Sequence, residues 1–224
     1  MMKVSVIGTG KTGSKVVEML GNQLLDAFDE NNMPTIEKLK RADALIIFVP
    51  GDAVGNIIEM VLASGTPAAW GSTGYEWPDD LDRRVQSLRT KWVLANNFSL
   101  GMNLIRKAID RMSVGSEVLN SPEFHIHEVH HIHKKDAPSG TAISWQNWLN
   151  QPVDISSTRE GDVNGIHELT IRTGTEKITL VHEALDRSIF AEGAIWTAEQ
   201  LVRNQQLKYG VHTFGELFDL ATNV

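Results

Sequence analysis

Short apolar runs alternate with amphipathic segments through the first half of the chain. Residues 3–7, 24–28 and 44–49 have the length and apolar character of strands, and Ala44-Leu45-Ile46-Ile47-Phe48-Val49 is the strongest strand signal in the sequence. Apolar positions at helical spacing predict helices over 11–20 and 36–40. Strands that alternate with helices at this spacing form βαβ units, so the pattern predicts a parallel sheet.

Two residues mark helix ends in the same region. Thr35 is expected to cap the helix over 36–40, because its hydroxyl can accept a hydrogen bond from a first-turn N–H group. A further helix over 54–63 is expected to end at Gly65, in the position after a helix where glycine is favoured.

The pattern changes near the middle of the chain. Residues 123–132, 165–172 and 177–182 are rich in β-branched residues and are predicted to be strands, with helical patterns on either side. This mixture predicts an α+β region with an antiparallel or mixed sheet. Residues 191–201 are predicted to be helical, and the tail 210–220 is expected to pack back on the first region.

Composition narrows the class of protein. The 224 residues are 42% hydrophobic and 22% charged, as in ordinary globular proteins, and carry a net charge of -7 that argues against a nucleic-acid partner. The absence of cysteine excludes disulfides, thiolate nucleophiles and cysteine-ligated metals. We find neither a signal-peptide pattern nor an apolar stretch of membrane-span length. We therefore expect a cytoplasmic protein with no membrane partner.

The first strand is followed by a glycine-rich loop that matches G-x-G-x-x-G. The loop consists of Gly8, Thr9, Gly10, Lys11, Thr12 and Gly13, and it opens the helix predicted over 11–20. Glycines at these positions allow a tight turn and let a pyrophosphate approach backbone N–H groups at the positive end of a helix. The strand and helix context favours dinucleotide binding over a turn that binds nothing.

Further candidate cofactor residues follow the strand predicted over 24–28 and the apolar runs at 68–70 and 92–94. Asp29-Glu30 lies where an acceptor for a ribose 2'-hydroxyl is expected, about twenty residues after the glycine loop. Ligands of open parallel sheets bind beyond the carboxyl ends of the strands. Two later loops occupy such positions, although either alone would be an ordinary loop: Gly71, Ser72, Thr73 and Gly74, and Ala95, Asn96, Asn97 and Phe98.

The acidic pair also predicts the coenzyme. An acidic side chain favours a free ribose 2'-hydroxyl and repels the 2'-phosphate of NADPH, and no cation follows Asp29-Glu30 until Lys38. Lys11, inside the glycine loop, is the one residue that argues for NADPH. The sequence predicts use of NADH or NADPH, with a bias towards NADH.

Five of the eight histidines fall within residues 125–133. His127-Glu128-Val129-His130-His131 satisfies the zinc-protease pattern H-E-x-x-H, which requires two histidines one turn apart on a helix. Interleaved apolar and polar residues predict a strand here instead, and a strand separates positions i and i+4 by about 13 Å, too far to share one zinc ion. We therefore predict no metal site and interpret the histidines as proton carriers.

The residues after the histidines predict an anion site. Ser139-Gly140-Thr141-Ala142 follows Pro138 and is typical of a helix start, whose backbone N–H groups can hold a carboxylate. Lys134 lies a few residues upstream and could neutralise the same anion or donate a proton. Together with the dinucleotide loop, these residues indicate reduction of a small acidic substrate.

At these residues the chain closely resembles the 4-hydroxy-tetrahydrodipicolinate reductases, also called dihydrodipicolinate reductases. Residues 128–142 match the family motif E-x-H-H-x-x-K-x-D-A-P-S-G-T-A at every specified position. Further family segments are matched by the Gly8 to Gly13 loop and by residues 71–74, 97–103, 159–167 and 187–194.

The resemblance implies an α/β fold: a Rossmann-like dinucleotide-binding domain (1–99 with 190–224), plus a smaller α+β domain (100–189) for substrate binding and tetramerisation. It implies reduction of a cyclic dicarboxylate in lysine and diaminopimelate biosynthesis, by hydride transfer, loss of water and protonation, in a homotetramer. By the same resemblance His130 and Lys134 are the acid/base pair, and the substrate-binding positions are His131, Lys134, Gly140 and Thr141.

Two departures from the family pattern concern the cofactor. The segment between residue 28 and Ala44 is shorter than in most members, and Ile47-Phe48-Val49 stands where many members have D-F-T. They affect cofactor affinity and coenzyme choice more than the chemistry. An alternative hypothesis is a nicotinamide-binding sensor or structural protein that keeps the fold, against which the intact His130, His131 and Lys134 argue.

Overall fold

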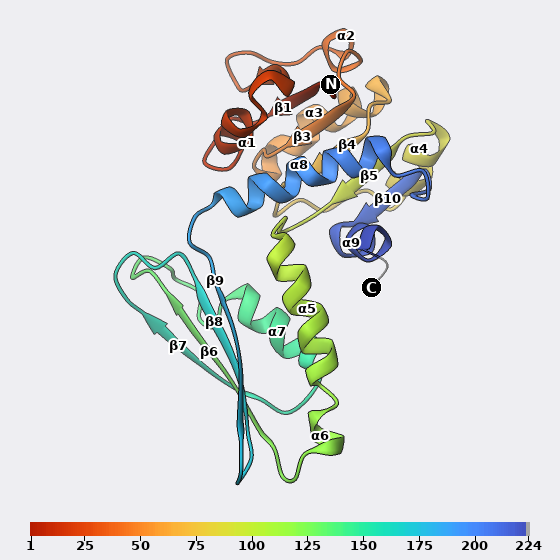
Figure 1. Ribbon diagram of the computed structural model, residues 1–224. Helices are drawn as coiled ribbons and strands as arrows, with labels where there is room; N and C mark the ends of the chain where they lie inside the picture. The colour runs from red at the N-terminus through yellow and green to blue at the C-terminus, as the bar shows by residue number, and fades with distance from the viewer. Residues whose placement is uncertain (223–224) are drawn as a thin grey trace. The chain divides into compact units, whose positions relative to one another are not determined.

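The computed structural model describes residues 1–222, and its first unit is built on a six-stranded parallel sheet (Figure 1). The strand order is β10-β5-β4-β3-β1-β2, and every neighbouring pair runs parallel, which confirms the predicted parallel sheet. The central strands are buried along their length, as apolar runs covered on both faces must be. The strands are β1 (Val4–Ile7), β2 (Leu24–Phe28), β3 (Ala44–Ile47), β4 (Ala68–Trp70), β5 (Lys91–Leu94) and β10 (Gly210–Thr213).

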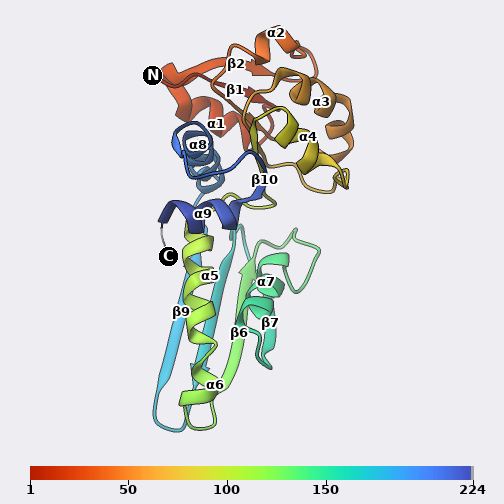
Figure 2. The same cartoon turned by 90° about the vertical axis from the view of Figure 1, so that its right-hand side faces the viewer.

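Helices cover both faces of this sheet, each face with its own hydrophobic core (Figures 1 and 2). One core packs Val16 and Ala194 against the sheet, and the other packs Leu39 and Ile57 against the opposite face. This arrangement is the predicted Rossmann-like fold. The helices of the unit are α1 (Gly13–Leu20), η1 (Gly21–Gln23), α2 (Ile36–Leu39), α3 (Gly51–Ser64), α4 (Leu81–Ser87), α8 (Ser188–Arg203) and α9 (Phe214–Thr222).

The predicted helix ends are confirmed at both marked residues. The Thr35 side chain accepts a hydrogen bond from the Lys38 N–H, and Gly65 takes up the left-handed conformation with a φ of 67°. The start of α3 differs from the prediction, because the helix begins at Gly51, directly after Pro50. Proline is tolerated at a helix start, because the N–H group that it lacks would have no partner within the helix there.

The tail also joins the first sheet. Residues 210–213 form β10, which pairs in parallel with β5, and α9 follows it directly. The described chain divides into two compact units, one of residues 1–100 with 187–222 and one of residues 101–186. The roles assigned to these units from the sequence stay predictions.

The second unit holds a mixed four-stranded sheet in the order β7-β6-β8-β9. The central strand β6 runs parallel to β7 and antiparallel to β8, so the expected antiparallel or mixed sheet is mixed. The α+β prediction for this region is confirmed. Its elements are α5 (Leu100–Met112), α6 (Gly115–Val118), β6 (Glu123–His130), α7 (Gly140–Leu149), β7 (Asp154–Arg159), β8 (Ile166–Arg172) and β9 (Lys177–Glu183).

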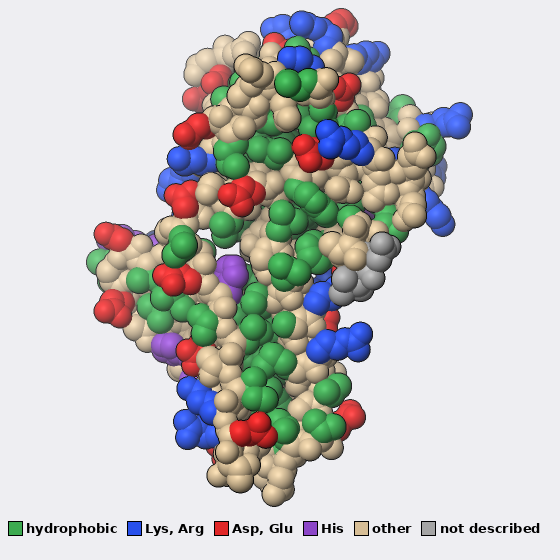
Figure 3. Space-filling view, in the orientation of Figure 1, with side chains coloured by type: hydrophobic (Ala, Val, Ile, Leu, Met, Phe, Trp, Pro, Cys, Tyr) green, Lys and Arg blue, Asp and Glu red, His purple; other side chains and the backbone are tan. Residues whose placement is uncertain are grey.

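Alternation along β6 decides what this sheet buries. Phe124 and Ile126 point into a core that includes Trp145 of α7 and Ile109 of α5, and Glu128 lies on the same face. Intervening residues such as His125 lie on the opposite face. Figure 3 shows hydrophobic side chains gathered down the middle of the visible face of this unit. Among the described residues, no helix has the length and hydropathy required to span a bilayer.

Candidate functional site

The glycine loop after β1 needs glycine for two different reasons. Gly8 has a φ of 91°, and a Cβ on it would overlap the Phe48 carbonyl, while a Cβ on Gly13 would overlap the Gly8 carbonyl. A Cβ on Gly10 would meet no protein atom within 4 Å. Gly8 and Gly13 are thus required by the protein's own packing. Gly10 instead leaves open space in which a ligand can come close to the backbone.

A cavity of about 610 Å³ lies beside this loop. It is lined by Gly8, Thr9, Gly10 and Asp29, four of the predicted cofactor residues. None of the lining residues, all from the described part of the chain, is a lysine or an arginine. Glu30, predicted only as part of an acidic pair with Asp29, also lines the cavity. The remaining lining residues, several of them from α3, were not predicted as cofactor residues: Ile7, Asn31, Met33, Val49, Pro50, Asp52, Ala53, Asn56 and Ile57.

Asp29 is partly committed to shaping its own loop. Its Oδ1 accepts hydrogen bonds from the N–H groups of Asn31 and Asn32 at 2.9 and 3.0 Å, and its Oδ2 accepts one from the Thr9 hydroxyl at 3.4 Å. The carboxylate therefore links the end of β2 to the glycine loop. Thr9 belongs to the glycine loop, which is predicted to hold the coenzyme phosphates.

A second cavity, of about 190 Å³, lies at the carboxyl ends of β3, β4 and β5. It brings together six predicted residues, Thr12, Gly71, Ala95, Asn96, Asn97 and Phe98, and adds Phe48 and Phe190. The Phe48 and Phe98 rings meet edge to face, with centroids 5.8 Å apart. Five predicted residues line neither cavity: Lys11, Gly13, Ser72, Thr73 and Gly74. All these assignments to a cofactor stay predictions.

The histidine segment forms the strand β6, as predicted, and this geometry separates the residues of the H-E-x-x-H pattern. His127 Nδ1 lies 2.7 Å from the Ser156 hydroxyl, while Glu128 points the other way and is fully buried. His131 follows the end of the strand. The zinc-protease arrangement is therefore not formed, because it needs these side chains on one face of a helix.

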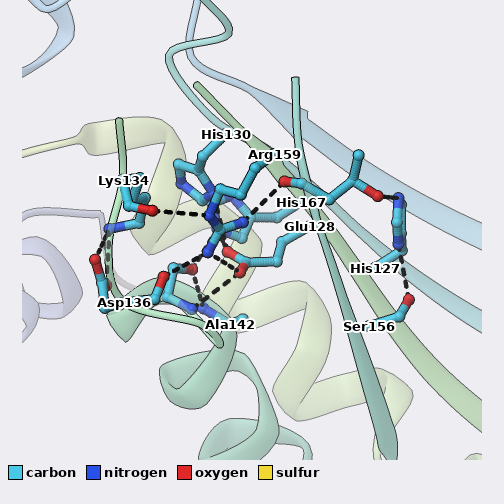
Figure 4. Close-up of polar contacts among 11 residues, drawn as sticks. His127, Glu128, His130, Lys134, Asp136, Ala142, Ser156, Arg159 and His167 are labelled. Carbon is cyan, nitrogen blue, oxygen red and sulfur yellow. Dashed lines mark hydrogen bonds and ion pairs between the residues drawn. The ribbon is translucent and has the colours of Figure 1, made fainter. Parts of the chain in front are cut away.

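Glu128 is instead the centre of a buried polar cluster (Figure 4). Its Oε1 accepts hydrogen bonds from Arg159 Nη2 at 3.0 Å and from the Ser139 N–H at 3.1 Å. Its Oε2 lies 3.0 Å from His130 Nδ1 and 3.8 Å from His167 Nε2. Burial raises the pKa of Glu128, but hydrogen bonds from Ser139, Ser157 and Arg159 outweigh it and hold the pKa at about 2. Glu128 is a carboxylate at neutral pH.

Both histidines of this cluster lose affinity for a proton. Burial lowers the pKa of His130, against an opposing effect of the Glu128 carboxylate. Burial lowers the pKa of His167 to about 4, and repulsion from a protonated His130 ring acts in the same direction. The two imidazoles are therefore mainly neutral at pH 7, and they meet edge to face with centroids 5.0 Å apart.

Lys134 lies in the loop between β6 and α7, and its side chain is 23% exposed. Its ammonium group donates to both carboxylate oxygens of Asp136, each at 2.8 Å. The Arg159 guanidinium reaches the same loop, where it donates to the backbone carbonyls of Lys134 and Asp136. An acidic ligand that engages Lys134 must therefore compete with Asp136.

The helix start predicted at Ser139 is confirmed. The Ser139 hydroxyl caps α7 by accepting a hydrogen bond from the Ala142 N–H at 3.2 Å, and it lies 3.1 Å from His167 Nε2. Within residues 1–222 the N–H groups of Gly140 and Thr141 have no hydrogen-bond acceptor. These two donors point to the position where a carboxylate would bind.

Glu128, His130 and His167 also place three possible metal-ligand atoms within 4.8 Å of one another. A cation there would be repelled by the Arg159 guanidinium, which already binds Oε1 of the Glu128 carboxylate. We therefore keep the prediction that the purified protein contains no stoichiometric zinc and that chelators leave its activity intact. Elemental analysis showing one zinc per chain, lost together with activity, would contradict it.

Comparison with known proteins decides the family. A model of the family "Dihydrodipicolinate reductase, C-terminus" matches residues 101–214. A 4-hydroxy-tetrahydrodipicolinate reductase of Bdellovibrio bacteriovorus is 31% identical over 180 residues, which cover 78% of this chain and 77% of the relative. The chain belongs to the 4-hydroxy-tetrahydrodipicolinate reductase family. The Rickettsia rickettsii member of this reductase family is 30% identical over 224 residues, a match that covers 88% of this chain and 92% of the relative.

Solved structures agree on the fold of this reductase family. Dipicolinate-bound dihydrodipicolinate reductase from Paenisporosarcina sp. TG-14 has a TM-score of 0.74 at 17% identity, covering 95% of this chain and 97% of that one. Aspartate semialdehyde dehydrogenase II from Vibrio cholerae has a TM-score of 0.56 at 11% identity, covering 92% and 99%. The family match also gives weight to two residues of the buried cluster, Arg159 and His167. In the sequence alone, Arg159 and His167 are only the two ends of a matched family segment.

Proposed function

We propose that this chain reduces 4-hydroxy-tetrahydrodipicolinate to tetrahydrodipicolinate with a nicotinamide coenzyme, in lysine and diaminopimelate biosynthesis. The observation that carries the proposal is the convergence of His130, Lys134 and the free N–H groups of Gly140 and Thr141 in a member of this reductase family. A proton-carrying ring, a cation and two anion-binding donors suit the reduction of a small dicarboxylate.

The first unit has the features that a dinucleotide requires. The open space at Gly10 suits a pyrophosphate, and the cavity of about 610 Å³ suits the adenosine part, with Asp29 and Glu30 as ribose partners. The smaller cavity with Phe48 and Asn97 would hold the nicotinamide part. When bound, the coenzyme supplies the hydride. The protein's own contribution is to bind and orient it.

The second unit supplies charge and protons. We assign one substrate carboxylate to the N–H groups of Gly140 and Thr141, with Lys134 turning from Asp136 to the substrate and His131 completing the site. Lys134 and His130 form the acid/base pair that protonates the reduced ring and assists the departure of water. Because burial lowers the pKa of His130, its ring is mainly unprotonated at neutral pH, and we assign the donated proton to the Lys134 ammonium group.

The test of this function is an assay of purified protein for substrate-dependent oxidation of NADH or NADPH. We expect coenzyme oxidation that depends on 4-hydroxy-tetrahydrodipicolinate and is inhibited by dipicolinate, which is bound in the Paenisporosarcina relative. If the protein binds a nicotinamide coenzyme but oxidises neither form with this substrate, the alternative of a sensor or structural protein gains support.

We expect NADH to be used at least as well as NADPH. Asp29, Glu30 and Asp52 line the larger cavity, and neither Lys11 nor any other cation does. A 2'-phosphate placed there would meet carboxylates with no arginine to bind it. Comparing kcat/KM for both coenzymes at one salt concentration tests this. A tenfold preference for NADPH, worth about 1.4 kcal/mol, would show that Lys11 reaches the phosphate after all.

We further propose that the second unit assembles the cytoplasmic protein into a homotetramer. The sheet face that carries His125, Thr170 and Val181 lies opposite the core packed on α5 and α7, and Val181 is 51% exposed. An open sheet face with an exposed valine is suited to contact with a second copy of the chain.

A further inference from the structure

The Glu128 carboxylate is the most deeply buried charge of the candidate site, with 0% of its surface exposed. The residue lies on β6, opposite Ser157 of β7 and His167 of β8. Carboxylates are seldom placed in such positions, because removing them from water is unfavourable unless several donors compensate. Glu128 has these donors, and they come from elements far apart in the sequence.

Three parts of the proposed site converge on this one carboxylate (Figure 4). His130 Nδ1 lies 3.0 Å from its Oε2, and the backbone N–H of Ser139, at the start of α7, donates to its Oε1. The third part is the loop that carries Lys134. Arg159 connects this loop to Glu128. The guanidinium donates to Glu128 with Nη2 and to the Lys134 carbonyl with Nε, at 3.3 Å.

We propose that Glu128 is a positioning residue of the reductase site, whose buried carboxylate fixes the His130 ring, the Lys134 loop and the start of α7 relative to one another. Arg159 is its partner and carries this effect to the loop. The proposal rests on the proposed function for the meaning of the site, although the contacts themselves do not depend on it. Neither residue needs to touch the substrate.

The same geometry sets the charge around His130. The charged and titratable groups that face its ring are Glu128 on its own strand, His167 on β8, Arg159 on β7, and Lys134 and Asp136 in the loop. Burial lowers the pKa of His130 most; the Glu128 carboxylate raises that pKa, while the Lys134 and Arg159 cations lower it. Glu128 and Arg159 therefore act on the His130 proton in opposite directions. A residue that served packing alone would have no such signed effect.

Two single variants test the proposal. Glu128→Gln keeps the shape and removes the charge, and it is expected to lower kcat by about tenfold or more with little change in coenzyme affinity. In an NMR titration of the His130 ring, its pKa should fall in Glu128→Gln and rise in Arg159→Gln. Glu160→Gln is the matched control, because Glu160 is an exposed carboxylate next to Arg159 in the sequence. It should leave kcat and the His130 pKa unchanged.

Removing one charge of a buried pair can unfold a protein, so the double variant Glu128→Gln/Arg159→Gln is included. It removes both charges and is expected to fold, with kcat still lowered about tenfold. Wild-type kcat in the folded double variant, or shifts of the His130 pKa in the same direction in both single variants, would overturn the proposal. An inactive wild-type protein with the predicted opposite shifts would refute only the proposed function.

Discussion

Replacing Lys134 with alanine is expected to lower turnover by about a hundredfold or more, while nicotinamide binding stays nearly unchanged. The ammonium group belongs to the loop that leads into α7, and its present partner is the Asp136 carboxylate. Without Lys134, a substrate carboxylate would face the Asp136 carboxylate with no cation between them, and the reduced ring would lose its proton donor. His130→Ala is expected to behave similarly, since it removes the other half of the pair.

Steady-state kinetics and coenzyme titration of both variants measure this effect. Lys135→Ala is the control, because Lys135 is the adjacent cation in the same loop, is exposed, and makes no side-chain hydrogen bond or ion pair within residues 1–222. It should retain turnover close to that of the unaltered protein. Turnover near the wild-type value in both Lys134→Ala and His130→Ala would refute the assignment of residues 128–142 as the active site.

Gly10→Ala is expected to weaken coenzyme binding at least tenfold without changing the melting temperature. A Cβ at this position meets no protein atom within 4 Å, so the folded protein tolerates it, but the added methyl group enters the space needed for close approach of a pyrophosphate. Gly13→Ala should instead lower the melting temperature as well, because its Cβ would overlap the Gly8 carbonyl and force the loop to move. Such overpacking costs about 1–3 kcal/mol.

Thermal unfolding and coenzyme titration distinguish the two effects. Gly174→Ala, in the turn between β8 and β9, is the control, because its Cβ also has open space and the residue belongs to the other unit. It should alter neither quantity. Unchanged coenzyme affinity in Gly10→Ala would mean that the pyrophosphate does not lie against this loop, and the cofactor site would have to be sought elsewhere.

Local chemistry in the sequence was sufficient for several structural elements. The apolar run at residues 44–49 gave a buried strand, although β3 ends at Ile47, after which the chain turns towards Pro50 and α3. Thr35 and Gly65 fixed helix ends because capping depends on neighbouring residues alone. The strand β7 was missed, since its sequence Asp154–Arg159 is polar and only half-buried at the sheet edge.

The candidate site combines residues that are neighbours in the sequence with residues that strand pairing and helix packing bring together. Lys134 and the Ser139 helix start lie in one continuous segment with His130, so their closeness could be predicted from their spacing along the chain. The acid that links them depends on sheet register: Glu128 meets Arg159 and His167 only because β6 pairs with β7 on one side and with β8 on the other. The larger cavity likewise needed α3 to bring Asp52 beside Asp29. Contacts between residues distant in sequence are set by strand register and helix packing, which only the tertiary structure decides.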